Sequence, residues 1–492
     1  MKFLPVKSAL AVASVLAAAQ AAAAVPGYAG NVTGGGSATA VSVSSLSAMQ
    51  TAINNYSGTG GLVLKYTGTF DFTPIKSNLC GQWSKSVQEL SIKDKSNITI
   101  LGADGSAANF GIRMTGSTSN IIIRNMTIGL VPGGGNNGDA IGIESGTKNI
   151  WIDHNELFSA NIYCEGTPGD DTAFEGLMDV KGTATNITIS YNYIHDHRKV
   201  GLDGSSDSDS TSRQITLAHN WYENVGERMP LQRFGLTHIY NNYYNKITTS
   251  GINVRMGGSS LIEGNYFENS VNPVTSRDSK SIGYWDLRNN NITSASDFGT
   301  YKITWVASTS SATKDATDWT TTKAFPSAIP YTYTVDPALK VKCIAMASAG
   351  AGKGLKESAD VIASCGGTAS SSSSSVSSSA PASSSSSSSV AASSSSSSRA
   401  SSSSSSSSAA SSSSSASGAP VPAGTGDYPT GFAKCADLGG TCSVSSGTGW
   451  VAFGRKGKWV VKNVGVGNSV ACTVAVFGSD PGGNPNKCST QN

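Results

Sequence analysis

A short sequence unit recurs seven times between residues 119 and 292, and it constrains the fold more than any other feature of the chain. Each unit is a run of strand-forming residues that ends in asparagine and continues with aromatic or aliphatic residues, as in "ITISYNYI" and "ITLAHNWY". The repeated asparagines are Asn125, Asn155, Asn192, Asn220, Asn242, Asn265 and Asn289. Their steps of 30, 37, 28, 22, 23 and 24 residues, without helix-period stretches between them, indicate a solenoid whose turns stack on one continuous core. We predict a right-handed parallel β-helix.

The asparagines and the aromatic residues that follow them suit structural roles in such a coil. Stacked asparagines can hydrogen-bond from one turn to the next at a tight bend. Residues such as Tyr193 and Trp221, which follow the repeated asparagine, can stack on one another. The competing all-β fold, a sandwich, favours antiparallel hairpins with turns every 8 to 12 residues, roughly. The longer repeat argues against it.

The longer steps identify the turns that carry loops. Steps of 30, 37 and 28 residues exceed the basic 22 to 24, so extra residues must project from the coil. The three long steps contain "GGGNNGDAIG", "DDTAFEGLMDVKG" and "HDHRKVGLDGSSDSD", and "GERMPLQRFG" follows in the next turn. Adjacent coils lie about 4.8 Å apart. We therefore expect the acidic and basic side chains of these segments to meet in space.

The acidic residues of the first two loops predict a cation site. Clustered carboxylates cannot all ionise side by side without a cation, and ligands that are only oxygens suit Ca²⁺ better than zinc. An EF-hand is excluded because "DGSSDSDSTSRQ" lacks the required glycine and terminal glutamate. Two alternatives stay open on spacing alone, namely solvated acidic loops and a site built on the histidines, which are spread over different coils.

Composition divides the rest of the chain. Residues 1–24 have the positive start, short apolar centre and small-residue end of a secretory signal, so we expect a secreted, extracellular protein. Residues 366–425 are almost all serine and are predicted to form a flexible linker. The two remaining units, 25–365 and 426–492, hold four cysteines each, which predicts two disulfides per unit in an oxidising compartment.

The C-terminal unit, 426–492, is small and glycine-rich, with β-forming runs such as "KWVVKNV". Its core must be thin, so we expect its disulfides to stabilise it. Trp450, Phe453, Trp459 and Phe477 suit a carbohydrate-binding module that stacks aromatic faces on sugar rings. The same four residues equally suit the core of the module, and both interpretations stay open.

Charge and hydropathy exclude two classes of partner. A formal net charge of +3, with only 14% charged residues, is too mild to indicate a nucleic-acid partner. Beyond the predicted signal, no apolar run approaches the roughly 20 residues of a membrane span. We expect neither nucleic acid nor membrane as a partner, and a monomeric protein.

Five motifs carry a family resemblance. "GDAI", "WIDHNELFS", "FEGLMDVKG", "YNYIHDHRKVGLDGSS" and "RMPLQRFG" occur in the order and approximate spacing of the secreted bacterial pectate lyases of polysaccharide lyase family 1. The similarity covers essentially all of 25–365, and the WiDH and RxPxxR stretches together are highly specific. The resemblance implies a parallel β-helix, dependence on Ca²⁺, and cleavage of polygalacturonate by β-elimination to 4,5-unsaturated oligogalacturonides. It also implies the disulfides Cys80–Cys164 and Cys343–Cys365.

The same resemblance implies roles for residues of the long turns. These are the calcium ligands Asp139, Glu175 and Asp179, the catalytic base Arg228, and the substrate-binding residues Lys181, Lys199, Arg233 and Arg255. Asn137 stands where the family usually has a first aspartate. Its amide oxygen can ligate Ca²⁺ without contributing charge, so we expect weaker metal affinity or a site that the substrate carboxylate completes. Asp153 of the WiDH stretch is expected to be structural.

The implied chemistry explains why acids and bases occur together. β-Elimination removes the C5 proton, which lies next to a carboxylate that is already charged, and Ca²⁺ on that carboxylate would act as a Lewis acid. From a reference pKa of about 12.5, deprotonating an arginine at pH 7 costs roughly 7.5 kcal/mol. We therefore expect activity to rise above neutral pH.

Three other functions share this type of scaffold. A pectin lyase would act on methyl-esterified chains without calcium, which the acids at 139, 175 and 179 oppose. A polygalacturonase would hydrolyse its substrate with paired carboxylates, so its product would lack a new double bond. A non-catalytic β-helical binding protein would need no arginine beside the acids and would leave polygalacturonate unchanged.

Overall fold

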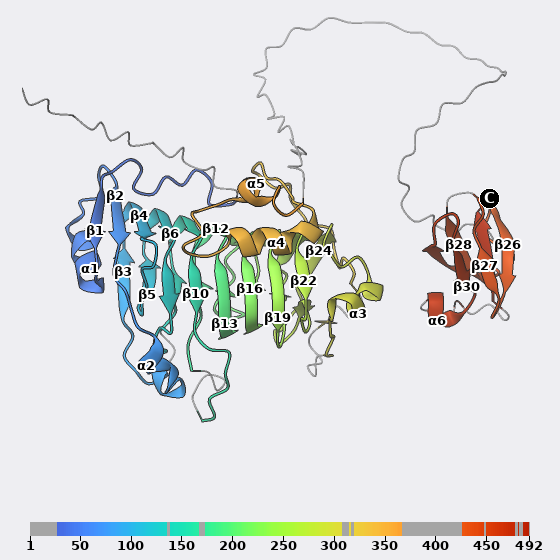
Figure 1. Ribbon diagram of the computed structural model, residues 1–492, viewed down its shortest axis with the longest axis horizontal. Coiled ribbons are helices and arrows are strands. Elements are labelled where there is room, and N and C mark those ends of the chain that lie inside the picture. The colour runs from blue at the N-terminus through green and yellow to red at the C-terminus, as the bar shows by residue number, and fades with distance from the viewer. Residues whose placement is uncertain are drawn as a thin grey trace, which may run out of the picture. The chain divides into compact units, whose positions relative to one another are not determined.

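The computed structural model of the protein describes residues 27–134, 138–166, 173–307, 314–315, 319–366, 426–446, 449–477, 481 and 486–491. The described residues form two compact units, on either side of a boundary within the serine-rich stretch. The predicted secretory signal and nearly all of the predicted linker lie outside the described residues, as does Asn137. The larger unit is a coil of short strands, as Figure 1 shows.

Three sheets of mainly parallel strands build the coil. Sheet A contains β1(Ala40–Val43), β2(Leu62–Tyr66), β4(Ser96–Gly102), β6(Ser119–Arg124), β9(Lys148–Asp153), β12(Thr185–Ser190), β15(Gln214–Ala218), β18(Leu236–Tyr240), β21(Ser259–Glu263) and β24(Tyr284–Arg288). Sheet B contains β3(Glu89–Lys93), β5(Gly111–Thr115), β8(Ile141–Ile143), β11(Met178–Val180), β14(Leu202–Asp203), β17(Leu231–Arg233), β20(Ile252–Arg255), β23(Val274–Ser276) and an antiparallel edge strand, β25(Lys314–Asp315). Sheet C contains β7(Thr127–Gly129), β10(Glu156–Phe158), β13(Tyr193–Lys199), β16(Trp221–Glu227), β19(Tyr243–Ile247) and β22(Tyr266–Glu268).

The chain visits the sheets in the order A, C, B in each full turn, and each strand pairs in parallel with its equivalent one turn later. Hydrogen bonds therefore run along the axis of the coil, and the side chains of one face of each strand point into a shared interior. This arrangement confirms the predicted parallel β-helix.

Isoleucines stack inside the coil. Ile98, Ile121, Ile150, Ile187 and Ile215 occupy matching positions of consecutive strands in sheet A, and all five are fully buried. Their β-branched side chains are stiff and pack well on a pleated surface. Burial of one such side chain contributes about 1.5–3 kcal/mol relative to exposure. The repeat of strand-forming residues in the sequence is thus the repeat of this core.

An asparagine ladder follows the bend between sheets A and C. Nδ2 of Asn155 donates to Oδ1 of Asn192 at 2.9 Å, and the same Oδ1 accepts the backbone N–H of Asn155. The Nδ2-to-Oδ1 contact continues at 2.9–3.1 Å through Asn220, Asn242, Asn265 and Asn290. The ladder satisfies buried backbone groups at each bend, as the sequence predicts.

The predicted alignment is wrong by one residue at each end of the ladder. Asn125 lies one position before the ladder, where its Nδ2 donates to the carbonyl oxygen of Gly102 at 2.9 Å. At the other end, Asn290 rather than Asn289 accepts the hydrogen bond from Asn265. Consecutive asparagines in "RNNN" leave the register open, and pairing of sheet A decides it.

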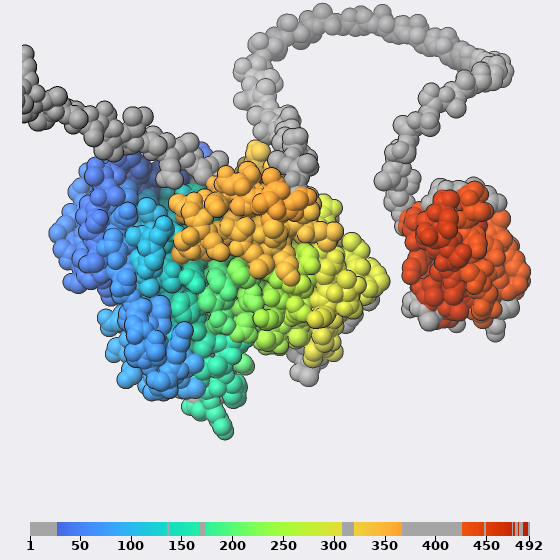
Figure 2. All heavy atoms as spheres, viewed as in Figure 1, coloured from blue at the N-terminus to red at the C-terminus, as the bar shows by residue number. Residues whose placement is uncertain are grey.

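Aromatic side chains stack along sheet C and carry the C-terminal helices of the larger unit. The ring of Trp221 lies 4.1 Å from that of Tyr193 and 6.2 Å from that of Tyr243, which confirms the predicted stacking. Helix α4(Ala338–Ser348) lies across sheet C in Figure 1 and buries Val341 and Ala345 against Tyr243. Figure 2 shows this gold-coloured segment covering part of the coil. A disulfide, Cys343–Cys365, joins α4 to the turn after α5(Ser358–Val361), as the family resemblance implies.

Short helices close or decorate the coil. Helix α1(Leu46–Asn55) lies between β1 and β2, at one end of the coil in Figure 1, and buries Met49 and Ile53. The loop after β2 carries α2(Thr73–Lys76) and η1(Cys80–Gln82), and the disulfide Cys80–Cys164 ties it to the loop after β10. Two further turns are η2(Ala295–Asp297) and α3(Phe298–Tyr301). No helix within the described ranges has the length and apolarity that crossing a membrane requires.

The smaller unit is a compact antiparallel β-structure. Its strands are β26(Phe432–Asp437), β31(Lys487–Gln491), β28(Trp450–Arg455) and β29(Lys458–Asn463) in one sheet, β27(Thr441–Ser443) and β30(Ser469–Ala471) in a pair, with helix α6(Val474–Phe477). Phe453 and Phe477 stack in its core, whereas Trp450 and Trp459 are half-buried. Its disulfides are Cys435–Cys442 and Cys472–Cys488, so the prediction of two disulfides per unit is confirmed.

Candidate active site

Two of the acidic residues meet on the outer side of sheet B. Asp139 precedes β8, and β11 pairs with β8 so that Asp179 lies opposite Gly142. Ile141 and Ile143 point into the core, so Gly142 and Asp179 face outward. Parallel stacking therefore brings carboxylates from two successive long turns to neighbouring positions.

Lys181 connects these two carboxylates. Its Nζ donates to Oδ2 of Asp139 at 2.7 Å and lies 3.1 Å from Oδ2 of Asp179. Lys181 follows β11 two residues after Asp179, which puts both side chains on the same face. The ammonium group thus stands between two carboxylates, where positive charge offsets their repulsion.

Burial and mutual repulsion favour the protonated form of these acids. Burial raises the pKa of Asp139 to about 8, and Asp179 adds to the rise while Lys181 opposes it. Burial also raises the pKa of Glu175, again with a contribution from Asp179. Carboxylates packed in this way are stabilised in their charged form by a cation beside them.

A glycine makes the close approach of the acids possible. A Cβ atom at Gly176 would lie 2.4 Å from Oδ1 of Asp179 and 3.1 Å from Oδ1 of Asp139. Asp179 is held in place from the other side, because its Oδ1 accepts the backbone N–H of Leu202 at 3.0 Å. Any side chain at Gly176 would displace the carboxylates that define the site.

Arg228 lies on the loop from β16 to β17, where the chain passes from sheet C to sheet B. Its φ of +72° places a non-glycine residue in the left-handed region, a strain that often marks functional loops. Its Nε is buried and lacks a hydrogen-bond partner among the described residues, and the nearest carboxylate oxygen, on Glu227, is 3.7 Å away. Within the described part of the chain, the guanidinium therefore has no tight carboxylate partner.

The acids and this arginine share one electrostatic environment. The charges of Lys199 and Arg228 both act on Glu175, where they oppose the rise of its pKa. Lys199 ends β13 and pairs in register with Glu227, the residue before Arg228. The structure thus brings the predicted acidic ligands, Lys199 and Arg228 to one region of the coil.

Arg233 and Arg255 lie on the two following strands of sheet B and extend this charged region along the coil. They occupy paired positions of β17 and β20. Burial, together with the positive charges of Arg233 and Arg228, lowers the pKa of Arg255 to about 10. Three guanidinium groups therefore lie close enough to repel one another, which favours an anionic ligand nearby.

Sequence reasoning missed the aspartates that hold two of these arginines. Oδ1 of Asp207 accepts Nε of Arg233 at 2.9 Å and Oγ of Ser279 at 2.8 Å. Nη2 of Arg255 lies 3.6 Å from Oδ2 of Asp278. The only signal for Asp207 is an acid within the serine-rich loop "DGSSDSD", and spacing does not link it to residues seventy positions later.

A third aspartate, Asp203, was also missed, and it faces the coil interior. It pairs with Val180 and is buried, and its Oδ2 has no hydrogen-bond partner among the described residues. Burial raises the pKa of Asp203 to about 7, with Asp179 adding to the rise and Arg213 opposing it. This carboxyl group lies just beneath the acidic surface of sheet B.

Asp153 lies outside this constellation, in sheet A. It is fully buried, and its Oδ2 accepts Nε of Arg124 at 2.7 Å while Oδ1 accepts Oγ of Ser190 at 2.7 Å. These contacts agree with the structural role expected for it.

The side-chain oxygens of the acidic residues suit a hard cation, but they supply only part of its coordination. Asp139, Glu175 and Asp179 offer only oxygens, which Ca²⁺ prefers, and the position of the Lys181 ammonium marks where positive charge is stabilised. Within the described ranges no three His, Cys, Asp or Glu side chains are close enough together to hold a metal ion. A bound Ca²⁺ would therefore need further oxygens from water or substrate, and the calcium site stays a prediction.

Comparison with known proteins decides the family. The family model for pectate lyase matches residues 4–420 of the chain. The chain belongs to the pectate lyase family. It is 49% identical over 337 residues to pectate lyase C of Dickeya chrysanthemi, a match that covers 66% of this chain and 88% of that protein.

Solved structures of pectate lyases share the fold. Pectate lyase II from Xanthomonas campestris pv. campestris is 51% identical, with a TM-score of 0.63 over 68% of this chain and 99% of that one. Pectate lyase C from Erwinia chrysanthemi is 45% identical, with a TM-score of 0.64 over 67% of this chain and 97% of that one. The predicted family, the β-helical fold and the assignment as a polysaccharide lyase are confirmed.

Proposed function

We propose that this pectate lyase cleaves α-1,4-linked polygalacturonate by calcium-dependent β-elimination, with Arg228 as the base. The observation that carries the proposal is that the charges of Arg228 and Lys199 both act on Glu175, one of the candidate acidic ligands. Two solved structures of pectate lyase C support it. A pectate lyase C variant in which lysine replaces an arginine has been solved with pentagalacturonic acid, and pectate lyase C of Erwinia chrysanthemi has been solved with Ca²⁺.

The reaction removes a proton from C5 of a galacturonate unit and breaks the bond between C4 and O4. The guanidine of Arg228 takes the C5 proton, and the electron pair of that C–H bond forms the double bond between C4 and C5. O4 leaves with the electron pair of the C4–O4 bond and takes a proton from solvent, and the guanidinium of Arg228 returns the C5 proton to solvent. No water is added, so the new end of the chain is unsaturated.

The carboxylate next to C5 is the obstacle, because proton loss places more negative charge beside it. Asp139, Glu175 and Asp179 would hold Ca²⁺, which when bound neutralises the substrate carboxylate and stabilises the charge that develops there. Lys181 contributes from the chain itself, since its ammonium already lies between Asp139 and Asp179 and can turn toward a substrate carboxylate.

Basic residues along the coil would hold neighbouring galacturonates. Arg233 suits a bidentate contact with a carboxylate, and Asp207 fixes its guanidinium in place. Arg255 is only 7% exposed at its side chain, so it acts mainly by adding positive charge behind Arg233. Lys199, at the end of β13, would meet the carboxylate nearest Arg228.

An assay with polygalacturonate tests the reaction type. We expect ultraviolet absorbance of unsaturated ends to appear with Ca²⁺ and to disappear with a chelator, and to return when Ca²⁺ is restored. New reducing ends without ultraviolet absorbance would indicate hydrolysis and overturn the proposal. Activity that survives chelation and prefers methyl-esterified chains would replace it with a pectin lyase.

We also propose that the protein is secreted and extracellular, and that its C-terminal unit binds plant cell-wall polysaccharide. Pairing of every cysteine in disulfides supports an oxidising compartment. In the C-terminal unit the two phenylalanines form the core, which leaves the half-buried Trp450 and Trp459 available to a sugar. Residues 426–492 contain six lysines and arginines against three aspartates, which suits an anionic polysaccharide. Retention of the full chain on insoluble pectate gel, compared with a Trp459→Ala variant, tests this role.

A further inference from the structure

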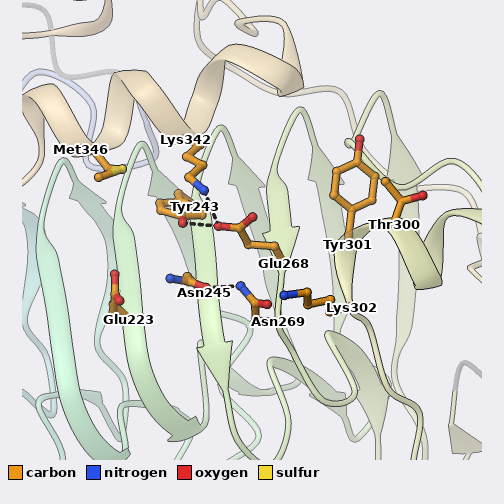
Figure 3. Close-up of a pocket in the computed structure, with 10 residues that line it drawn as sticks. All are labelled: Glu223, Tyr243, Asn245, Glu268, Asn269, Thr300, Tyr301, Lys302, Lys342 and Met346. Atoms are coloured by element: carbon orange, nitrogen blue, oxygen red, sulfur yellow. Dashed lines mark hydrogen bonds and ion pairs between the residues drawn. The ribbon is translucent and has the colours of Figure 1, made fainter.

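A polar cavity of ≈ 400 Å³ lies on the outer face of sheet C, on a different sheet from the acidic cluster. Its floor consists of Glu223, Asn245 and Glu268, which occupy matching positions of β16, β19 and β22. Figure 3 shows these side chains below α4, with Tyr301 and Lys302 at one side of the cavity. The cavity is therefore built by the same stacking that builds the coil.

Hydrogen bonds fix the side chains of the floor. Glu268 accepts Oη of Tyr243 at 2.5 Å and Nζ of Lys342 at 2.7 Å. Oδ1 of Asn245 accepts Nδ2 of Asn269 at 2.8 Å. Side chains that are already held in one conformation lose little entropy when a ligand binds.

Several polar atoms remain open toward the cavity. Nδ2 of Asn245 and Nζ of Lys302 make no hydrogen bond or ion pair within the described part of the chain. Glu223 uses one carboxylate oxygen for Lys246, at 3.0 Å, and its other oxygen can accept from a ligand. The open set thus contains both donors and acceptors.

This chemistry selects a class of ligand. The carboxylates of Glu223 and Glu268 are paired with Lys246 and Lys342, so the floor carries no net charge that selects an anion. Lys342 also occupies the position beside Glu268 that a divalent cation would take. The polar floor disfavours an apolar molecule. A hydroxyl group both donates and accepts, so a neutral sugar can satisfy Asn245, Glu223 and Lys302 together, while its apolar ring face contacts Tyr301.

We propose that this cavity is a second carbohydrate-binding site that takes a neutral sugar unit carried by the polysaccharide substrate. Strand β16 links it to the candidate active site, because Glu223 lies five residues before Arg228. At about 3.3 Å per residue, the two positions are roughly 16 Å apart along the strand. A side-chain sugar held in the cavity therefore keeps its parent chain close to the site of cleavage.

Calorimetric titration of the full-length protein tests the proposal. The probes are galactotriose, which is neutral, and trigalacturonate, both with chelator present so that neither is cleaved. Asn245→Leu removes the open donor at similar volume, and Tyr301→Ala removes the ring at the rim. Asn54→Leu, an exposed position on α1, is the matched control.

We expect saturable binding of galactotriose to the unaltered protein and to the control, and at least tenfold weaker binding to each cavity variant. Cleavage of polygalacturonate, which carries no neutral sugar, should be equal in all four proteins and shows that each variant is folded. Absence of saturable binding, or equal binding by the cavity variants, overturns the site. Loss of trigalacturonate rather than galactotriose binding in the variants overturns its neutral specificity.

Discussion

Two polar ladders on the same coil differ in how their charges are balanced. On sheet B, Asp139 and Asp179 crowd around a single lysine, and burial and repulsion raise the pKa of Asp139 to about 8. On sheet C, Asn245 separates the carboxylates of Glu223 and Glu268, and each of these has a lysine of its own. Like charges close together on a sheet face are destabilising, and the second ladder keeps its two carboxylates apart with Asn245 between them.

The difference teaches where to look for chemistry on a repetitive scaffold. A balanced ladder is satisfied within the protein and suits an uncharged ligand. An unbalanced ladder stores electrostatic repulsion that a cation or a charged substrate relieves, which is how perturbed acids mark functional sites. The first two tests that follow act on this contrast, and the third compares two histidines in different environments of sheet C.

The largest effect is expected for Arg228→Lys, on the unbalanced side. Lysine keeps the charge but loses the planar guanidine and its geometry, so removal of the C5 proton should slow by about 10²–10⁴-fold. Ultraviolet absorbance of unsaturated ends measures the rate. Arg113→Lys, an exposed arginine paired with Glu144 on the same sheet, is the control and should keep its activity. Full activity of the Arg228 variant would remove this residue from the role of base.

The second-largest effect is expected for stabilisation by Ca²⁺, which should depend on the sheet B ladder and not on the sheet C ladder. Added at 100 times its dissociation constant, Ca²⁺ should raise the unfolding free energy of the unaltered protein by about 2.7 kcal/mol. Asp179→Ala should lose most of this gain, whereas Glu268→Ala, on the balanced ladder, should keep it. Thermal unfolding with Ca²⁺ and with chelator measures the stabilisation by Ca²⁺ in each variant. Equal stabilisation of the two variants would place the ion elsewhere.

Two histidines on β13 give a smaller, pH-dependent contrast. His197 faces the interior, where burial lowers its pKa to about 3. His195 faces outward on sheet C, where burial opposes protonation but hydrogen bonds with Asp196 and Glu156 raise its pKa overall. Because an unfolded histidine titrates near 6.5, roughly, His197 stabilises the fold above that pH, and this stability is lost as pH falls toward 3.

The contribution of His195 to the unfolding free energy depends on pH in the opposite direction. Its raised folded pKa stabilises the fold below the unfolded pKa, and this stabilisation is lost as pH rises through the folded pKa. Nuclear magnetic resonance titration should show His195 still protonated near pH 6.5 and His197 still neutral near pH 4.5, roughly the middle of its window. A His197→Gln variant should lose less stability between these two pH values than the unaltered protein. Coincident titration of the two rings would contradict the assigned environments.

Much of the fold follows from the sequence because its repeat is the repeat of the coil. The interior ladder from Asn155 to Asn265 was predicted correctly, since each asparagine sits at the end of a clear strand-forming run. At the ends, "RNNN" offers no unique register, and the single asparagine of "RNMT" lies one position early; strand pairing alone shows that Asn125 and Asn289 lie beside the ladder. In such cases the spacing of residues in the sequence does not determine the register, which depends on pairing with the neighbouring strand.

The candidate site could be predicted less fully. The family resemblance supplied the residues of the long turns, and stacking then brings Lys181 to Asp139 across forty-two positions. The sequence contains no pattern that predicts contacts between segments far apart in the chain. Asp207 meets Ser279, and Lys342 of α4 meets Glu268, only because loops and helices fold back onto the coil. Asn137 lies outside the described residues, so its predicted ligand role stays a prediction.

The asparagine ladder has a consequence for how such enzymes diversify. Its rungs are 37, 28, 22, 23 and 25 residues apart along the chain, yet the joining contacts stay between 2.9 and 3.1 Å. An insertion on the far side of a turn therefore leaves the neighbouring turns undisturbed. Insertions can therefore lengthen the loops of one turn at a time and change what the enzyme recognises, while the stacked coil keeps its structure.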